Sequence, residues 1–223
     1  MRKVFAPLLV IAAAMFAYAP VAINNAPYQS TMLLIQKIFY FHVGSWVALA
    51  CGLAVCGIAS LIYLFNGTPE ADRYANAGAE LTALFGLFGL ASGMLWARKA
   101  WGIWWEWDAR LTMAFMLELI FAGYLLVRKF GGPGAEKLAA GMGIFGAATA
   151  PFIYKSVDWW RTIHPKTSVI RSLDSPDSSP AMAHVLYFCM VAFVLLFCVL
   201  LALRVRLESE RAALDELYLL EEE

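Results

Sequence analysis

The amino-acid sequence predicts an all-α membrane protein that crosses the bilayer with six helices. Of the 223 residues, 61% are apolar and only 15% are charged, whereas about 25% of the residues in an average soluble protein are charged. The apolar residues are gathered in six long stretches with few or no charges inside them. No stretch alternates as a barrel strand does, so a helix, which satisfies its own backbone hydrogen bonds, is the expected spanning structure.

Each stretch approaches the roughly 20 residues that a helix needs to cross a bilayer. The predicted spans cover residues 4–23, 43–65, 78–97, 111–127, 138–154 and 182–203. We therefore predict a single transmembrane domain over residues 1–203, followed by a short charged cytoplasmic tail over residues 204–223.

The first span also resembles a cleavable signal peptide, because Arg2 and Lys3 precede the apolar run and small residues flank position 18. Since Pro20 follows at once and the apolar run continues to Ile23, we expect an uncleaved helix. With the N-terminus inside, nine Lys and Arg residues fall on the cytoplasmic side and eight outside, a weak positive-inside bias. This orientation predicts that the loops 24–41, 98–110 and 155–181 face outward.

All eight tryptophans fall at or near the predicted outer side: Trp46, Trp96, Trp101, Trp104, Trp105, Trp107, Trp159 and Trp160. An ordinary aromatic belt occurs at both membrane interfaces and also contains tyrosine, but the tyrosines here are spread over both sides. The asymmetry predicts an apolar surface against which another molecule lies. The densest cluster is WGIWWEWDARLT, residues 101–112, between the third and fourth spans.

If this cluster is helical, Trp101, Trp104, Trp105 and Asp108 form one stripe in the plane of the membrane interface. Three indoles next to a carboxylate make a better platform than a core. A carboxylate cannot stack, so we expect Asp108 to orient a ligand through a hydrogen bond to an imidazole. The alternative is a salt bridge that fixes Arg110 or Arg161.

Two of the three histidines are placed beside tryptophans. His42 lies four residues before Trp46, and His164 lies four residues after Trp160, so each imidazole shares a face with an indole where the chain is helical. A histidine near an interface is usually only a polar residue in a wet place, and His184, which has no neighbouring tryptophan, stays unassigned.

Two imidazoles, an aromatic floor and nearby cations suit iron porphyrin, which takes axial nitrogen ligands and carries two propionates. A zinc site would need three or four closely spaced ligands. The net charge of zero gives no reason to expect nucleic acid as a partner. The candidate cations are Arg98, Lys99, Arg110, Lys155, Arg161 and Lys166.

The motif WGIWWEWDARLT resembles the WWD signature of the haem-handling membrane proteins of cytochrome c maturation. The motif SVDWWRTIHP narrows the resemblance to the CcmC, or haem exporter protein C, family, and the match covers most of residues 36–165. It implies that His42 and His164 are paired haem ligands on the outer face. The other residues expected to bind the haem are Trp101, Trp104, Trp105, Trp107, Asp108, Trp159, Trp160, Arg110 and Arg161.

The sequence departs from the family pattern at Gly44, where proline usually follows the His-Val pair, and Glu118 inside the fourth span is not part of that pattern. Glu118 is either a functional intramembrane carboxylate or a neutral group bonded to a neighbouring helix.

The resemblance implies a non-enzymatic haem-handling subunit in a bacterial inner membrane, with haem b as cargo on the periplasmic side. The implied partners are a membrane-anchored haem chaperone, the ATP-binding and membrane subunits of an ABC transporter, and a small single-span protein. Because the sequence has no G-x-x-x-x-G-K-[ST] loop, ATP must bind to another chain.

Three other classes of protein remain open. A cytochrome c haem lyase-type assembly enzyme is usually longer and carries a further histidine pair inside the membrane. A bis-histidine electron-transfer subunit usually places its histidine pairs within helices. A haem-free scaffold or small transporter would lack the Soret absorbance band of haem.

Overall fold

The computed structural model describes residues 2–28, 32–164 and 179–221, and all regular elements in these ranges are helices. A short 3-10 helix, η1 (Leu33–Ile35), precedes the second of six long helices. These are α1 (Arg2–Asn25), α2 (Gln36–Asn66), α3 (Pro69–Ala100), α4 (Ala109–Phe130), α5 (Ala135–Trp159) and α7 (Pro180–Glu221). The predicted all-α class is confirmed, and each predicted span lies in one of these helices.

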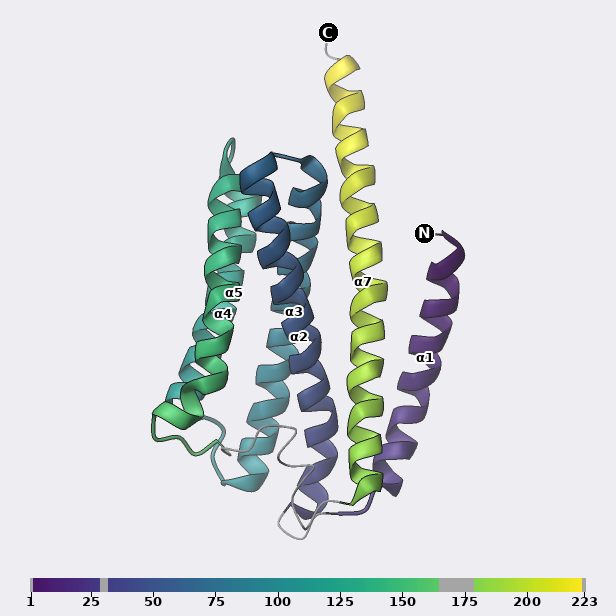
Figure 1. Cartoon of the computed structure of the whole chain (residues 1–223), viewed down its shortest axis with the longest axis vertical. Helices are drawn as coiled ribbons and strands as arrows, with labels where there is room; N and C mark the ends of the chain where they lie inside the picture. The colour runs from purple at the N-terminus through teal and green to yellow at the C-terminus, as the bar shows by residue number, and fades with distance from the viewer. Residues whose placement is uncertain (1, 29–31, 165–178, 222–223) are drawn as a thin grey trace.

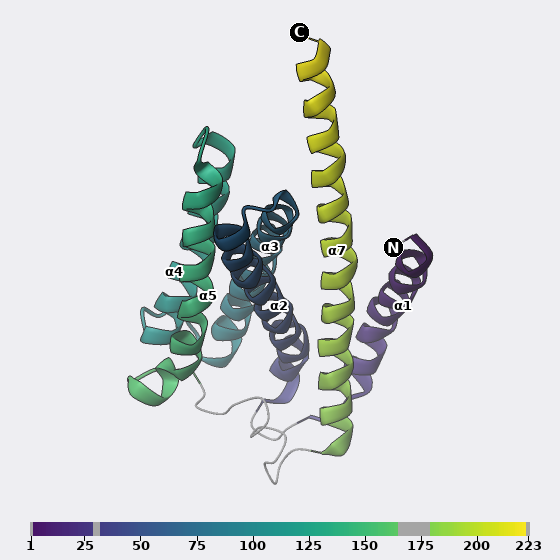
Figure 2. The ribbon, with the colours of Figure 1, turned by 45° about the horizontal axis from the view of Figure 1, so that its top comes forward.

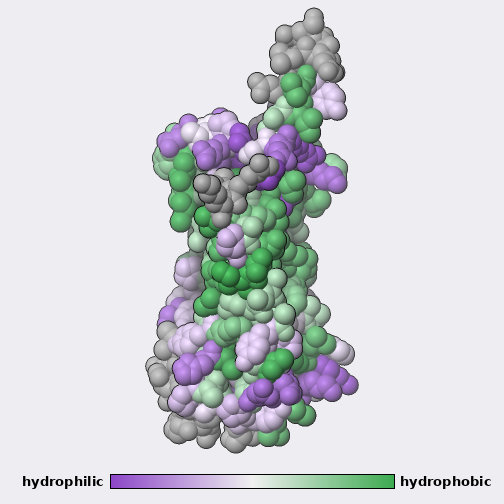
Figure 3. All heavy atoms as spheres, turned by 90° about the vertical axis from the view of Figure 1, so that its right-hand side faces the viewer, coloured by the Kyte–Doolittle hydropathy of each residue, from purple (hydrophilic) through white to green (hydrophobic). Residues whose placement is uncertain are grey.

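Five of the helices, all except α5, are long and apolar enough to cross a membrane. The sequence of α5 is rich in alanine and glycine, which are less apolar than leucine, but the helix packs against α4 and α2 in the same bundle. Figure 3 shows an apolar belt between two polar ends on the face that it presents. Broad exposed apolar surface of this kind marks contact with a membrane, so the molecule is a multi-pass membrane protein.

Helices α2 and α3 occupy the middle of the bundle (Figures 1 and 2), with α4 and α5 on one side and α7 on the other. Helix α1 packs chiefly on the outer face of α7. Where α2 and α3 meet they lie close together, since a Cβ atom on Gly78 would be only 2.8 Å from the backbone nitrogen of Cys56. Small residues commonly allow membrane helices to approach in this way.

The connections between helices fall at two ends of the bundle (Figure 1). The short turns between α2 and α3 and between α4 and α5 lie at one end, together with the C-terminal end of α7. The α3–α4 connection lies at the other end, together with the end of α1, the start of α2, the end of α5 and the start of α7. We call it the tryptophan-rich end because it carries the 101–108 segment. Residues 165–178, which include Lys166 and most of the predicted loop 155–181, lie outside the described residues.

Two ion pairs fasten the bundle toward the end opposite the tryptophans. Arg128 of α4 forms two 2.8 Å hydrogen bonds with Asp72 of α3, and Arg204 of α7 pairs with Glu80 of α3. Helix α7 continues without interruption past residue 203, so the residues predicted as a charged tail extend the helix to Glu221.

Glu118 is buried on α4. Its carboxyl group lies against Gly86 of α3, where an added Cβ atom would overlap Oε2. The close fit depends on the absence of a side chain at position 86.

Candidate functional site

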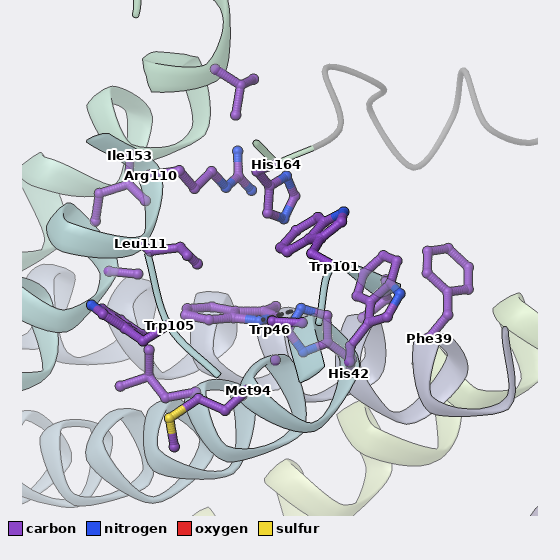
Figure 4. Close-up of a pocket in the computed structure, with 18 of the residues that line it drawn as sticks. Phe39, His42, Trp46, Met94, Trp101, Trp105, Arg110, Leu111, Ile153 and His164 are labelled. Atoms are coloured by element: carbon purple, nitrogen blue, oxygen red, sulfur yellow. Dashed lines mark hydrogen bonds between the residues drawn. The ribbon is translucent and has the colours of Figure 1, made fainter. Parts of the chain in front are cut away.

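A cavity of about 560 Å³ lies at the tryptophan-rich end, between α2, α3, α4 and α5. Its size falls within the roughly 300–1,000 Å³ typical of small-molecule sites. The main aromatic and titratable residues of its lining are Phe39, His42, Trp46, Trp96, Trp101, Trp104, Trp105, Arg110, Tyr154, Lys155, Asp158 and His164. Figure 4 shows His164 and Arg110 on one side of the cavity and His42 with Trp46 on the other. The fold thus brings together two histidines that are distant in the sequence.

His42 is buried on α2 and both of its ring nitrogens have partners. Trp46 Nε1 lies 3.2 Å from His42 Nε2, a contact that Figure 4 marks with dashes. Nδ1 lies 3.0 Å from Ser92 Oγ, and that hydroxyl lies 3.0 Å from the carbonyl oxygen of Gly89, to which it donates. Because an indole nitrogen can only donate, Nε2 must be the acceptor, and Nδ1 carries the proton that is donated to Ser92.

Two glycines on α3 make room for these two rings. A Cβ atom on Gly89 would be 2.9 Å from Cε2 of Trp46, and one on Gly93 would be 3.1 Å from Cε1 of His42. Rigid rings cannot withdraw as a flexible side chain would, so α3 needs small residues at these positions. Residues 89–94 of α3, with the sequence GLASGM, therefore form the surface against which the rings of His42 and Trp46 pack.

His164 reaches the cavity from a loop. Helix α5 ends at Trp159, and Trp160 is extended with a ψ of 160°. The predicted helical face shared by Trp160 and His164 is therefore wrong. His164 donates its backbone N–H to Thr162 Oγ1 over 3.0 Å, which holds the loop in a tight turn.

Asp108 ties this loop to the start of α4. Its Oδ1 accepts the N–H of Leu111 over 2.8 Å and so caps the helix, as Asp commonly does. Its Oδ2 accepts both the hydroxyl of Thr162 and the N–H of Ile163, the latter over 3.1 Å. We expected Asp108 to bond an imidazole or to fix Arg110 or Arg161, but in the structure it orients the backbone that carries His164.

The segment that contains four of the eight tryptophans is not helical, contrary to the predicted stripe. Helix α3 ends at Ala100 and α4 begins at Ala109, and Gly102 adopts a φ of +78°, which glycine tolerates without strain. Trp101 stacks on Trp96, with ring centres 6.4 Å apart. The irregular backbone places Trp101, Trp104 and Trp105 on the cavity wall.

Several other residues predicted for the site lie outside the cavity lining. Trp107 is 70% exposed and packs edge-on against Trp105 and Phe115. Trp159 is 56% exposed and Trp160 is 50% exposed. Arg161 is also exposed. His184 is exposed on α7 and does not line the cavity either.

Two of the predicted cations line the cavity. Arg110 donates to the backbone oxygen of Tyr154 over 3.1 Å and lies over its ring. Lys155 pairs with Asp158 at 3.2 Å. Arg98 lies over the ring of Trp104, outside the lining. The cavity therefore combines two histidines and an aromatic wall with positive charge at one side.

Sequence reasoning missed Ser92 and Thr162, the two hydroxyl groups that hold the histidines in place. A serine in an apolar span and a threonine two residues before a histidine are weak signals, because such residues often bond only to their own helix or turn. The spacing of Trp46 from His42 is visible in the sequence, but the hydrogen bond between the two rings is visible only in the structure.

Fold and cavity together define a multi-pass helical membrane protein with a tryptophan-lined cavity to which two histidines contribute. The family model described as "Heme exporter protein C" matches residues 1–217. The chain is 38% identical over 192 residues to Heme exporter protein C of Bradyrhizobium diazoefficiens, covering 83% of this chain and 71% of that protein.

Two further relatives with the same name are 31% identical to this chain. The protein of Haemophilus influenzae aligns over 174 residues, or 77% of this chain and 70% of its own length. The protein of Escherichia coli aligns over 195 residues, or 82% and 76%. The chain belongs to the Heme exporter protein C family, which confirms the resemblance found in its motifs.

Proposed function

We propose that this protein is a haem-handling subunit of a cytochrome c maturation system. In this proposal it holds haem at the outer face of the membrane through His42 and His164 and passes it to a membrane-anchored haem chaperone. The observation that carries the proposal is that both histidines line one aromatic cavity, although 122 positions separate them in the sequence. The family relationship supports the same function, since the relatives are named for haem export.

The residues of the cavity fit such a cargo. Burial of a flat apolar ring against indoles contributes on the order of 25 cal/mol per Å², so Trp46, Trp101 and Trp105 would provide most of the attraction. Arg110 and Lys155 would face the propionates, although an exposed ion pair adds at most about 1 kcal/mol.

The two histidines would hold the iron in different ways. His42 is on a regular helix and is fixed by Ser92, whereas His164 is on a loop fixed by Asp108 and Thr162. A small movement of the loop would remove one iron ligand. This arrangement suits a subunit that must bind its cargo firmly and then release it.

The remaining parts of the proposal concern the setting of the protein. We propose a bacterial inner membrane with the cavity on the periplasmic side, haem b as cargo, and no catalytic step at this subunit. The proposed partners are the haem chaperone, the ATP-binding and membrane subunits of an ABC transporter, and a small single-span protein. The family name and the membrane-spanning helices support this setting.

The absorbance spectrum of the purified protein tests the function. Protein purified in detergent, with and without the transporter subunits, is expected to show the Soret band and α/β bands of a six-coordinate haem. A preparation that takes up no added haem under either condition would contradict the proposal and favour a haem-free scaffold or transporter.

Reporter fusions test the orientation. Fusions after Asn66 and after Gly131, in the two short turns opposite the tryptophan-rich end, are expected to report a cytoplasmic location. A fusion after Lys166 is expected to report an external location, because the connections at the tryptophan-rich end share one side. The reverse pattern would place the cavity on the cytoplasmic side.

A further inference from the structure

The hydrogen bond between Trp46 and His42 involves the ring nitrogen that an iron would need. Nδ1 of His42 is protonated and held by Ser92 in a buried position, so Nε2 is the nitrogen left for a metal. Nε2 has one lone pair in the ring plane, and the indole N–H of Trp46 already takes it at 3.2 Å. The iron and the indole therefore compete for the same lone pair.

We propose that Trp46 is a positioning residue that holds His42 in the haem-free state and thereby promotes haem release. The proposal rests on the proposed function, because it takes His42 as an iron ligand. When haem binds, the hydrogen bond from the indole N–H to Nε2 of His42 breaks, and the lone pair of Nε2 is donated to iron instead. When haem leaves, the iron–nitrogen bond breaks and the hydrogen bond forms again. No proton is transferred, since the indole keeps its hydrogen and Nδ1 keeps the proton donated to Ser92.

The rigidity of the His42 side of the cavity explains why such a competitor is useful. His42 is 8% exposed on a regular helix and packs against Gly93. It cannot withdraw without disturbing α2 and α3. A hydrogen bond that replaces the iron bond lowers the free energy of the haem-free state, because a buried acceptor left without a partner is unfavourable.

The structure places Trp46 where it can serve both states. Its ring lies in the slot above Gly89 and also lines the cavity, so it can remain part of the aromatic wall when its N–H gives up the bond. One turn of helix separates it from His42, and both rings stand on the same face of α2. The four-residue spacing on α2 therefore keeps the indole of Trp46 beside the imidazole of His42.

Haem release from two variants tests the proposal. Full-length protein loaded with haem would be mixed with excess apomyoglobin, and the rate of haem transfer would be followed by absorbance. Trp46→Phe removes the N–H and some aromatic area, whereas Trp101→Phe removes comparable area from the same cavity at a residue that does not bond His42. Trp46→Phe is expected to release haem roughly 2- to 10-fold more slowly than Trp101→Phe, given the usual worth of one hydrogen bond. Release that is equally fast or faster would overturn the proposal.

A second measurement uses the haem-free protein and does not depend on haem affinity. In protein labelled with ¹⁵N-tryptophan, the indole N–H signal that disappears in Trp46→Phe belongs to Trp46. This signal is expected to move upfield in His42→Phe, which keeps a flat ring but has no acceptor nitrogen. An unchanged signal would show that the bond is absent in solution and would also overturn the proposal.

The two proposals fail in different ways. If the parent protein takes up no haem, the proposed function fails whatever the NMR signal shows. If the parent binds haem and His42→Ala lowers its haem content, but Trp46→Phe releases haem as fast as Trp101→Phe, only the role of Trp46 is wrong.

Discussion

Alanine in place of either His42 or His164 is expected to cause the largest loss of haem binding. Each substitution removes one proposed iron ligand, so the six-coordinate spectrum should change to a five-coordinate one or disappear. Haem affinity should fall by at least about 100-fold, because loss of a group that merely orients a metal-bound histidine already costs roughly 10- to 100-fold. Absorbance spectra and the haem content of the purified variants would measure both effects.

The third histidine provides the control. His184 is exposed on α7 and does not line the cavity, so His184→Ala should have the spectrum and haem content of the parent. If His184→Ala loses as much haem as His42→Ala or His164→Ala, the assigned pair of ligands is wrong.

Asp108→Asn is expected to weaken haem binding without reducing the amount of protein in the membrane. Asparagine caps a helix about as well as aspartate, so the start of α4 should stay intact. The carboxylate, however, accepts three hydrogen bonds, of which those from Thr162 and Ile163 hold the His164 loop. An amide has one oxygen in place of two and cannot accept all three. We expect roughly 10- to 100-fold weaker haem affinity and a disturbed spectrum.

Two variants at position 162 test whether Asp108 acts by holding the His164 loop or through its negative charge. The Thr162 hydroxyl donates to Asp108 and accepts the backbone N–H of His164. Thr162→Val keeps the shape but loses the hydroxyl, and should resemble Asp108→Asn, whereas Thr162→Ser should behave as the parent does. If Asp108→Asn and Thr162→Val both bind haem normally and support cytochrome c maturation, the Asp108–Thr162 contact has no part in haem binding.

The two proposed ligands stand on different kinds of backbone. His42 is part of helix α2 and its ring bonds Ser92 of α3, whereas His164 follows the end of α5 in a loop that Thr162 and Asp108 hold. A handover that begins at the loop and is completed when Trp46 takes back the lone pair of His42 would follow from these contacts. In such an order, Asp108 and Thr162 would affect mainly retention of haem, and Trp46 mainly its release.

The amino-acid sequence by itself determined the fold class, the helices and the end of the molecule that carries the site. Long apolar runs with few charges have no other economical structure in a bilayer than helices, so the six long helices could be predicted directly. The same pattern showed that the tryptophans, His42 and His164 gather at one end, because the order of spans and loops decides the side on which each residue falls. Helix α5 was found in this way even though its apolarity is lower than that of the other five.

Only the tertiary structure decided how these residues meet. Residues 101–108 and residues 160–164 have irregular backbones, so the helical periodicity that predicts the stripes does not apply to them. The partners of the histidines come from distant positions: Ser92 is 50 residues from His42, and Asp108 is 54 residues from Thr162. Such contacts depend on the close packing of α3 against α2 and on the length of each loop, and neither quantity follows from local pattern.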